Sequence, residues 1–138
     1  MPIDPARDFR PINIALLTVS DTRTPADDTS GDILAERISA AGHSLAERGI
    51  EKDDADLLVA RLTGWIDDPA IDAIVTTGGT GLTGRDVTPE ALDRIKDKDI
   101  PGFGELFRML SYRSIGTSTV QSRAVAVVAR GTYIFALP

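Results

Sequence analysis

The 138-residue sequence contains no cysteine and one histidine, and it has no run of basic residues. Without cysteine the chain forms no disulfide bond, no thiolate metal site and no cysteine nucleophile. Acidic residues outnumber basic ones by 21 to 15, so a nucleic-acid-binding surface is not expected. No apolar run approaches the ~20 residues that cross a membrane, and the amino terminus shows no signal-peptide pattern. These absences predict a cytoplasmic protein whose partners are neither nucleic acid nor a membrane.

Length and composition predict one folded domain. Hydrophobic residues make up 42% of the chain and charged residues 26%, which are ordinary proportions for a globular protein. A chain of this length can bury a core of its own. Residues 1–11 contain three prolines and mixed charges and are predicted to form an N-terminal arm, with residues 12–138 as the domain.

Apolar runs and amphipathic stripes alternate along residues 12–138. The helix that follows residue 30 is expected to be capped by Ser30 and to end at Gly42. Residues 112–122 are expected to be irregular. The predicted strands are residues 12–20, 43–50, 73–76, 124–129 and 132–136, and predicted helices follow residues 30, 57, 88 and 103. Alternating strands and helices predict an α/β fold, a doubly wound and mostly parallel sheet with helices on both faces.

Residues 73–89 (AIVTTGGTGLTGRDVTP) contain the densest cluster of chemically useful side chains. An apolar strand leads into a loop with four glycines, and Thr88-Pro89 then begin a helix. Such glycines permit either a tight turn or a backbone whose N–H groups approach an anion such as phosphate. The threonines and charged residues of the loop favour a binding site. Its candidate ligand-binding residues are Thr76, Gly78, Gly79, Thr80, Gly81 and Arg85.

Residues 79–84 also match the G-x-G-x-x-G pattern of dinucleotide-binding proteins. That pattern requires a helix that begins within the glycines and an acidic residue at the tip of the next strand. Here Pro89 places the helix start several residues too late, and the run before Asp99 is too polar for a buried strand. A nicotinamide-dependent oxidoreductase is therefore a remote alternative. The phosphate loop of nucleotide hydrolases is absent, because Arg85-Asp86 stand where Lys-Ser/Thr is required.

Ligands of doubly wound sheets bind beyond the carboxyl ends of the strands, which places Ser20-Asp21, Asp53 and the glycine loop at one edge. A phosphate cradle beside carboxylates suggests a phosphate ester with Mg²⁺, for which Asp53 and Asp86 are the candidate metal-binding and catalytic residues. Alternatively, Asp86 is an acid at a helix N-terminus and Asp53 a solvated surface residue. Ser118 and Ser122 either reach the ligand or cap backbone groups.

Five stretches of the chain resemble the MoaB/MogA family of molybdenum cofactor biosynthesis proteins, which includes the gephyrin and plant Cnx G domains. The resemblance covers residues 12–138, and the FRMLSY…IGTSTVQSRAVA run is most similar to the MoaB branch. The stretches are LLTVSDTRT (16–24), TTGGTG-x-x-x-RDVTPEA (76–91), PGFGELFRMLSY (101–112), IGTSTVQSRAV (115–125) and FALP (135–138).

The resemblance implies a homotrimer, or a hexamer of two trimers. It also implies that the protein binds molybdopterin and, with Mg²⁺, transfers AMP from ATP to the terminal phosphate of the pterin, releasing pyrophosphate. The catalytic aspartates of the family correspond to Asp86 and Asp53. The pterin and nucleotide pocket corresponds to the glycine loop with Ser20, Asp21 and Ser122. A non-catalytic molybdopterin-binding or scaffold paralogue is the alternative.

The sequence differs from the family pattern at two places. The family continues after FALP with a glycine–serine loop and a helix that contact the nucleotide, so the C-terminus is expected to be incomplete here, or ATP binding impaired. Lys52-Asp53 replaces the usual Pro-Asp, so the match of Asp53 rests on spacing. Arg85-Asp86, a pair that one inactive MoaB pattern lacks, is intact and favours activity.

Overall fold

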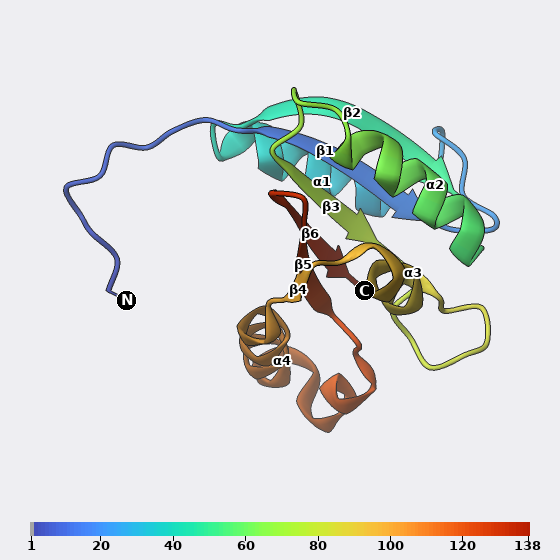
Figure 1. The fold of residues 1–138 in the computed structure, drawn as a ribbon. Helices are drawn as coiled ribbons and strands as arrows, with labels where there is room; N and C mark the ends of the chain where they lie inside the picture. Colours follow the sequence, from blue (N-terminus) through green and yellow to red (C-terminus); the bar gives the residue numbers. More distant parts are fainter. Residues whose placement is uncertain (1) are drawn as a thin grey trace.

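A computed structural model describes residues 2–138 and contains a six-stranded sheet with helices on both faces (Figure 1). The strands are β1 (Asn13–Val19), β2 (Ser44–Glu51), β3 (Ala73–Thr77), β4 (Lys98–Asp99), β5 (Val125–Ala129) and β6 (Thr132–Leu137). The helices are α1 (Thr29–Ala40), α2 (Ala55–Ile66), α3 (Thr88–Ile95) and α4 (Pro101–Ile115), and α4 is followed by a 3-10 helix, η1 (Gly116–Gln121). No helix of the described residues is both long and apolar enough to span a lipid bilayer.

The strand order is β2-β1-β3-β6-β5-β4, and the predicted fold class is confirmed. Neighbours among β2, β1, β3 and β6 run parallel, whereas β5 pairs antiparallel with both β6 and β4. A hairpin joins β5 to β6 through Arg130 and Gly131, whose φ angles of 47° and 83° form a tight turn. Because β1, β2 and β3 are parallel, their carboxyl ends lie at the same edge of the sheet.

Helices α2 and α3 cover one face of the sheet, where the larger core cluster lies. Leu58, Leu62 and Leu92 from these helices are fully buried and belong to the same cluster as Leu17 and Ile74 of the strands. Trp65 belongs to this cluster as well. The core therefore fixes β1 and β3 against α2 and α3 and sets the direction in which the loop after β3 leaves the sheet.

Helices α1 and α4 lie on the opposite face. Ile38 of α1 packs against Ile14 and Leu16 of β1, and Phe103 of α4 contacts Phe135 of β6 with ring centroids 5.2 Å apart. The rest of the apolar stripe of α4 does not pack on the sheet, because Leu110 is 49% exposed. Beyond its first turns, α4 therefore leaves apolar side chains that this chain does not cover.

Two local predictions also need correction. Asp28, not Ser30, caps α1, because its Oδ1 accepts from the Gly31 N–H at 3.0 Å. Its Oδ2 accepts from the Thr18 hydroxyl at 2.8 Å, so the capping carboxylate also ties the helix to β1. Residues 112–121 are helical rather than irregular: α4 ends where Gly116 adopts a φ of 60°, and η1 follows. The predicted arm comprises residues 1–11, of which residue 1 lies outside the described residues; residues 2–11 are exposed and run away from the sheet (Figure 1).

Candidate functional site

Three loops meet at the carboxyl edge of the sheet, as the sequence predicts. The loop after β1 is held to β2 because the Ser20 N–H donates to the Glu51 carbonyl at 2.8 Å. The loop after β2 is held to the loop after β1 because the Asp53 N–H donates to Oδ1 of Asp21 at 3.2 Å. The loop after β3 begins where the Gly78 N–H donates to the Leu137 carbonyl at 3.0 Å. These bonds bring the predicted acidic residues and the glycine loop together.

The first two glycines of the glycine loop, defined here as residues 78–86, can be replaced by no other residue without strain. Gly78 and Gly79 have φ angles of 98° and 70°, which side chains disfavour. A Cβ on Gly78 would lie 2.3 Å from the Val19 carbonyl oxygen. On Gly79 it would lie 2.3 Å from Oγ1 of Thr88 and 3.3 Å from Oδ1 of Asp53. The loop thus leaves β3 in direct contact with both β1 and Asp53.

Thr88, the first residue of α3, is fully buried and holds the start of the glycine loop. Its hydroxyl donates to the Gly78 carbonyl and its N–H donates to the Gly79 carbonyl, both at 3.0 Å. Within residues 2–138 the N–H groups of Gly79, Thr80, Leu82 and Gly84 donate to no protein acceptor, while the N–H of Gly81 faces the Asp86 carboxylate. Unpaired backbone N–H groups in a tight loop are suited to binding an anion.

The carboxylate of Asp86 folds back into the glycine loop. Its Oδ2 accepts from the N–H of Thr83 at 2.9 Å and from the hydroxyl of Thr83 at 2.7 Å. These two bonds lower the pKa of Asp86, the hydroxyl contributing most, so the side chain is ionised at neutral pH. Helix α3 receives no side-chain capping bond, so Asp86 organises the loop rather than the helix end. Neither bond uses Oδ1, the second carboxylate oxygen.

The pKa of Asp53 is shifted in the opposite direction to that of Asp86. Partial burial raises the pKa of Asp53, and the nearby carboxylates of Asp21 and Asp86 raise it further, while Arg85 opposes them. Asp53 and Asp86 both lie against the glycine loop, because a Cβ on Gly79 would be 3.3 Å from Oδ1 of Asp53 and one on Gly81 would be 2.7 Å from Oδ2 of Asp86. No group of three or more histidine or acidic side chains in the described chain is arranged to hold a metal ion. Two carboxylates nevertheless fit Mg²⁺, which commonly takes one or two carboxylates together with substrate phosphates and waters.

Arg85, predicted to pair with a phosphate, pairs with Asp21 in this structure. Its Nε donates to Oδ2 of Asp21 at 3.0 Å, and this bond lowers the pKa of the Asp21 carboxyl group. Arg85 is 67% exposed, so its guanidinium can exchange this partner for a ligand at the mouth of the site.

The remaining predicted site residues are engaged locally. The Ser20 hydroxyl oxygen accepts from the N–H groups of Thr22 and Arg23 at 3.2 and 3.0 Å, and that of Ser122 accepts from Ala124 at 3.3 Å. Thr76 and Thr80 are buried, and Oγ1 of Thr76 has no hydrogen-bond partner within residues 2–138. Ser118 is exposed on η1, and Gly81 lies against Asp86, where a Cβ would be 2.7 Å from Oδ2.

Sequence reasoning missed Arg123 and Glu90. The Arg123 guanidinium donates to the Gly81 and Asp86 carbonyls, each at 2.7 Å, and forms an ion pair with Glu90. The only signal was that Arg123 lies within a stretch that resembles a known family. A cavity of about 360 Å³ beside the glycine loop is bounded by Leu82, Thr83, Gly84, Asp86, Val87, Glu90 and Arg123.

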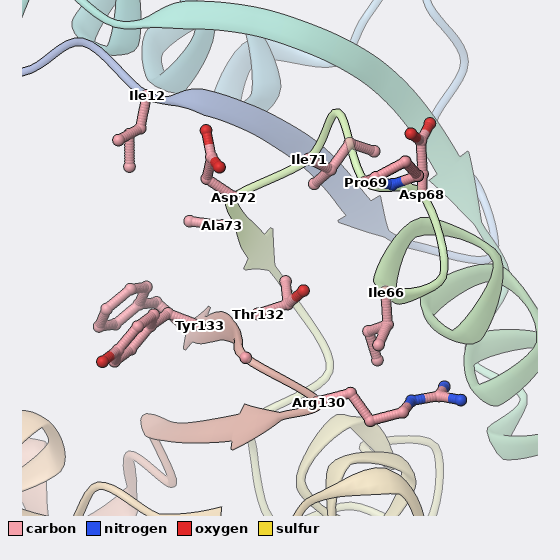
Figure 2. Close-up of a pocket in the computed structure, with 12 residues that line it drawn as sticks. Ile12, Ile66, Asp68, Pro69, Ile71, Asp72, Ala73, Arg130, Thr132 and Tyr133 are labelled. Atoms are coloured by element: carbon pink, nitrogen blue, oxygen red, sulfur yellow. The ribbon is translucent and has the colours of Figure 1, made fainter.

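A larger cavity of about 600 Å³ lies at the opposite edge of the sheet, where β1, β3 and β6 begin (Figure 2). Its charged groups already have partners in the protein. Oδ2 of Asp72 accepts from the Asn13 N–H at 2.8 Å, and Arg130 pairs with Asp67 at 2.9 Å. The ligand rule for doubly wound sheets also favours the carboxyl edge, so we assign the functional site to the edge that carries the glycine loop.

The protein has a doubly wound sheet whose carboxyl edge carries unpaired loop N–H groups and the carboxylates of Asp21, Asp53 and Asp86. It therefore belongs to the class of α/β proteins that are suited to anionic ligands. Residues 15–138 match a family described as a probable molybdopterin binding domain. The chain is 48% identical over 131 residues to molybdenum cofactor biosynthesis protein B of Escherichia coli K12, covering 95% of this chain and 77% of that protein. It is 42% identical over 128 residues to the protein of the same name from Bacillus subtilis, covering 92% and 75%.

Solved structures agree with this result. A crystal structure of a molybdenum cofactor biosynthesis protein B superposes with a TM-score of 0.91 at 39% identity, covering 96% of this chain and 83% of that one. The tungsten cofactor synthesizing protein MoaB from Pyrococcus furiosus superposes with a TM-score of 0.82 at 35% identity, covering 95% and 84%. This chain therefore belongs to the MoaB family of molybdenum cofactor biosynthesis proteins.

Proposed function

We propose that this protein is a molybdopterin adenylyltransferase, which transfers AMP from ATP to the terminal phosphate of molybdopterin. The observation that carries the proposal is the convergence of unpaired N–H groups of the glycine loop with Asp53 and Asp86 at one edge of the sheet. Family membership identifies the pterin, because the matched domain is described as molybdopterin-binding. Its cytoplasmic location remains a prediction from the sequence.

The reaction requires no nucleophile from the protein. A terminal phosphate oxygen of the pterin forms a bond to the α-phosphorus of ATP, the bond from that phosphorus to the bridging oxygen breaks, and pyrophosphate leaves. The protein contributes positioning and charge neutralisation, which dominate catalysis of phosphoryl-type transfers. The unpaired N–H groups of Thr80 and Leu82 would receive phosphate oxygens, and the exposed Arg85 would bind a further one.

Asp53 and Asp86 would hold Mg²⁺, which would neutralise charge on the phosphates. Burial raises the pKa of Asp53 and the carboxylates of Asp21 and Asp86 raise it further, so a cation bound beside Asp53 would favour its ionised form. Oδ1 of Asp86 is available because both bonds from Thr83 go to Oδ2. Hard carboxylate oxygens are the ligand type that Mg²⁺ prefers. The donor set therefore fits the ion, and a bound cation would relieve the repulsion among the three carboxylates.

We further propose that the protein is a homotrimer or a hexamer of two trimers. The supporting observation is the exposed apolar surface of α4 and η1, because exposed apolar patches mark protein–protein interaction sites. Its members are Leu106, Met109, Leu110, Ile115 and Val120, each about half exposed or more.

Incubation with molybdopterin, ATP and Mg²⁺, followed by detection of adenylylated pterin and pyrophosphate, tests the proposed reaction. The proposal predicts that both products appear in equal amounts. Tight pterin binding without either product would instead indicate the non-catalytic molybdopterin-binding or scaffold alternative. An increase in fluorescence of reduced nicotinamide on addition of the protein would favour the oxidoreductase alternative. Helix α3 begins at Thr88, beyond the last loop glycine, and this position argues against a dinucleotide site.

A further inference from the structure

We propose that Arg123 is a positioning residue that holds the glycine loop in the shape that presents its N–H groups to a phosphate of the ligand. The proposal rests on the proposed function, because that function assigns a phosphate-bearing substrate to the loop. Arg123 follows η1 and is distant in sequence from the glycine loop, although it contacts the loop in the folded chain. It is not one of the predicted ligand-binding residues.

Arg123 binds three carbonyl groups of the glycine loop. Its backbone N–H donates to the Thr80 carbonyl at 3.1 Å, its Nε to the Gly81 carbonyl at 2.7 Å and its Nη2 to the Asp86 carbonyl at 2.7 Å. These carbonyls lie in the middle and at the far end of the loop, so one side chain joins both parts. The planar guanidinium provides several donors in a fixed geometry, which the ammonium group of lysine does not.

The direction of these carbonyls determines the direction of the neighbouring N–H groups. In a trans peptide unit the carbonyl of one residue and the N–H of the next point to opposite sides. Because the Thr80 and Gly81 carbonyls face Arg123, the N–H groups of Gly81 and Leu82 point to the other side of the loop. The Leu82 N–H has no acceptor in the described chain. Arg123 thus orients potential phosphate-binding groups without contacting the phosphate.

Glu90 connects this arrangement to the core. Its carboxylate pairs with Nη1 of Arg123 and accepts a second bond from Nη2 at 3.3 Å. Glu90 lies in α3 next to Ala91 and Leu92, both of which are fully buried. Hydrogen bonding to Arg123 lowers the pKa of Glu90, so the pair is charged at neutral pH. The loop is therefore fixed at its start by Thr88 and at its middle and end, through Arg123, by α3.

The experiment compares Arg123→Lys with the wild-type protein in two measurements, hydrogen–deuterium exchange of residues 78–87 and calorimetric affinity for inorganic pyrophosphate. We expect exchange of the loop amides to accelerate while exchange of the sheet is unchanged. We expect pyrophosphate affinity to fall about tenfold, the scale for losing hydrogen bonds from a charged donor. The matched control is Arg94→Lys, because the Arg94 guanidinium pairs with the exposed Asp56 and lies in the same helix as Glu90. It should change neither measurement.

Chemical rescue separates a positioning role from a general loss of stability. In Arg123→Ala, millimolar methylguanidinium should restore part of the pyrophosphate affinity and slow the exchange of the loop. Unchanged exchange and affinity in Arg123→Lys would overturn the inference, as would an unrescued loss accompanied by faster exchange throughout the sheet. Failure of the wild-type protein to form adenylylated pterin while it still binds pyrophosphate would overturn the proposed function and leave this inference standing.

Discussion

The Arg85 guanidinium donates to the Asp21 carboxylate across 3.0 Å and joins the loop after β3 to the loop after β1. This bond holds the Arg85 guanidinium at the mouth of the site. A phosphate that binds Arg85 would have to compete with the Asp21 carboxylate. In the proposed function, Arg85 would contribute to phosphate binding only when the ligand displaces or joins Asp21. We therefore expect Asp21 to tune the affinity for phosphate.

Asp21→Asn should therefore increase the affinity for pyrophosphate measured without Mg²⁺. The substitution removes one negative charge from the site and weakens the hold on Arg85. We expect an increase of about threefold, because exposed ion pairs contribute little and are screened by salt. Arg85→Gln should decrease the affinity, and both effects should shrink at high ionic strength. Titration calorimetry at two salt concentrations provides the measurement, and equal affinities for the three proteins would contradict the competition.

Asp53→Asn should stabilise the protein at neutral pH. The pKa of Asp53 is raised in the folded state, so its ionisation costs stability as the pH increases from the unfolded pKa through the folded one. Below both values the carboxyl group is neutral in either state and the advantage of asparagine disappears. We expect a melting temperature about 2–4 °C higher at pH 7 and no difference in strong acid. Thermal unfolding across this pH range provides the check, and lower stability at pH 7 would show that the Asp53 carboxylate stabilises the fold.

Mg²⁺ should stabilise the wild-type protein in the presence of pyrophosphate and should do so less in Asp53→Asn. A ligand that binds only the folded state raises the melting temperature as its concentration increases. Removing the metal with a chelator should reverse the shift. The control is Asp68→Asn, because Asp68 lies at the opposite edge of the sheet beside the larger cavity. Equal stabilisation of both variants by Mg²⁺ would exclude Asp53 as a ligand.

The sequence predicted the sheet and the convergence of three loops, because both follow from patterns within short segments of the chain. Strand periodicity shows which segments are buried, and the carboxyl-edge rule then brings residues such as Asp53 and Asp86 together. The cap of α1 was misplaced by two residues because Asp28 and Ser30 are both suitable capping residues. Only the contact of Asp28 with Thr18 in the folded chain distinguishes them.

Two features could not be read from the sequence. Arg123 contacts carbonyl groups some 40 residues earlier, and backbone carbonyls have no residue-specific signature that spacing could reveal. The stripe along α4 showed the period of a packed helix, but periodicity does not tell whether the packing partner is the same chain or another one. Leu110, for example, is half exposed in this chain.

Asp86→Asn should preserve the fold and pterin binding while it decreases AMP transfer by at least ~10²-fold, the scale for losing one preorganised electrostatic group. Asparagine can keep a carbonyl oxygen where Oδ2 accepts from Thr83, so the loop should remain folded. The control is Asp93→Asn, an exposed aspartate that pairs with Lys96 in the region of α3. Single-turnover rates measured with both variants provide the comparison. An unchanged rate in Asp86→Asn would remove this residue from the mechanism.

The double substitution Leu106→Glu and Leu110→Glu should convert the oligomer to monomers. Burying one leucine side chain contributes roughly 1.5–3 kcal/mol, and a buried glutamate without a partner is costly, so two such changes should exceed what a subunit interface tolerates. Light scattering coupled to size-exclusion chromatography measures the mass, and circular dichroism checks the fold. Leu57→Glu is the matched control, because Leu57 is 44% exposed on α2 at the opposite face of the sheet. A wild-type protein that is monomeric at all concentrations would contradict the proposed assembly, and an unaltered mass in the double variant would move the interface away from α4.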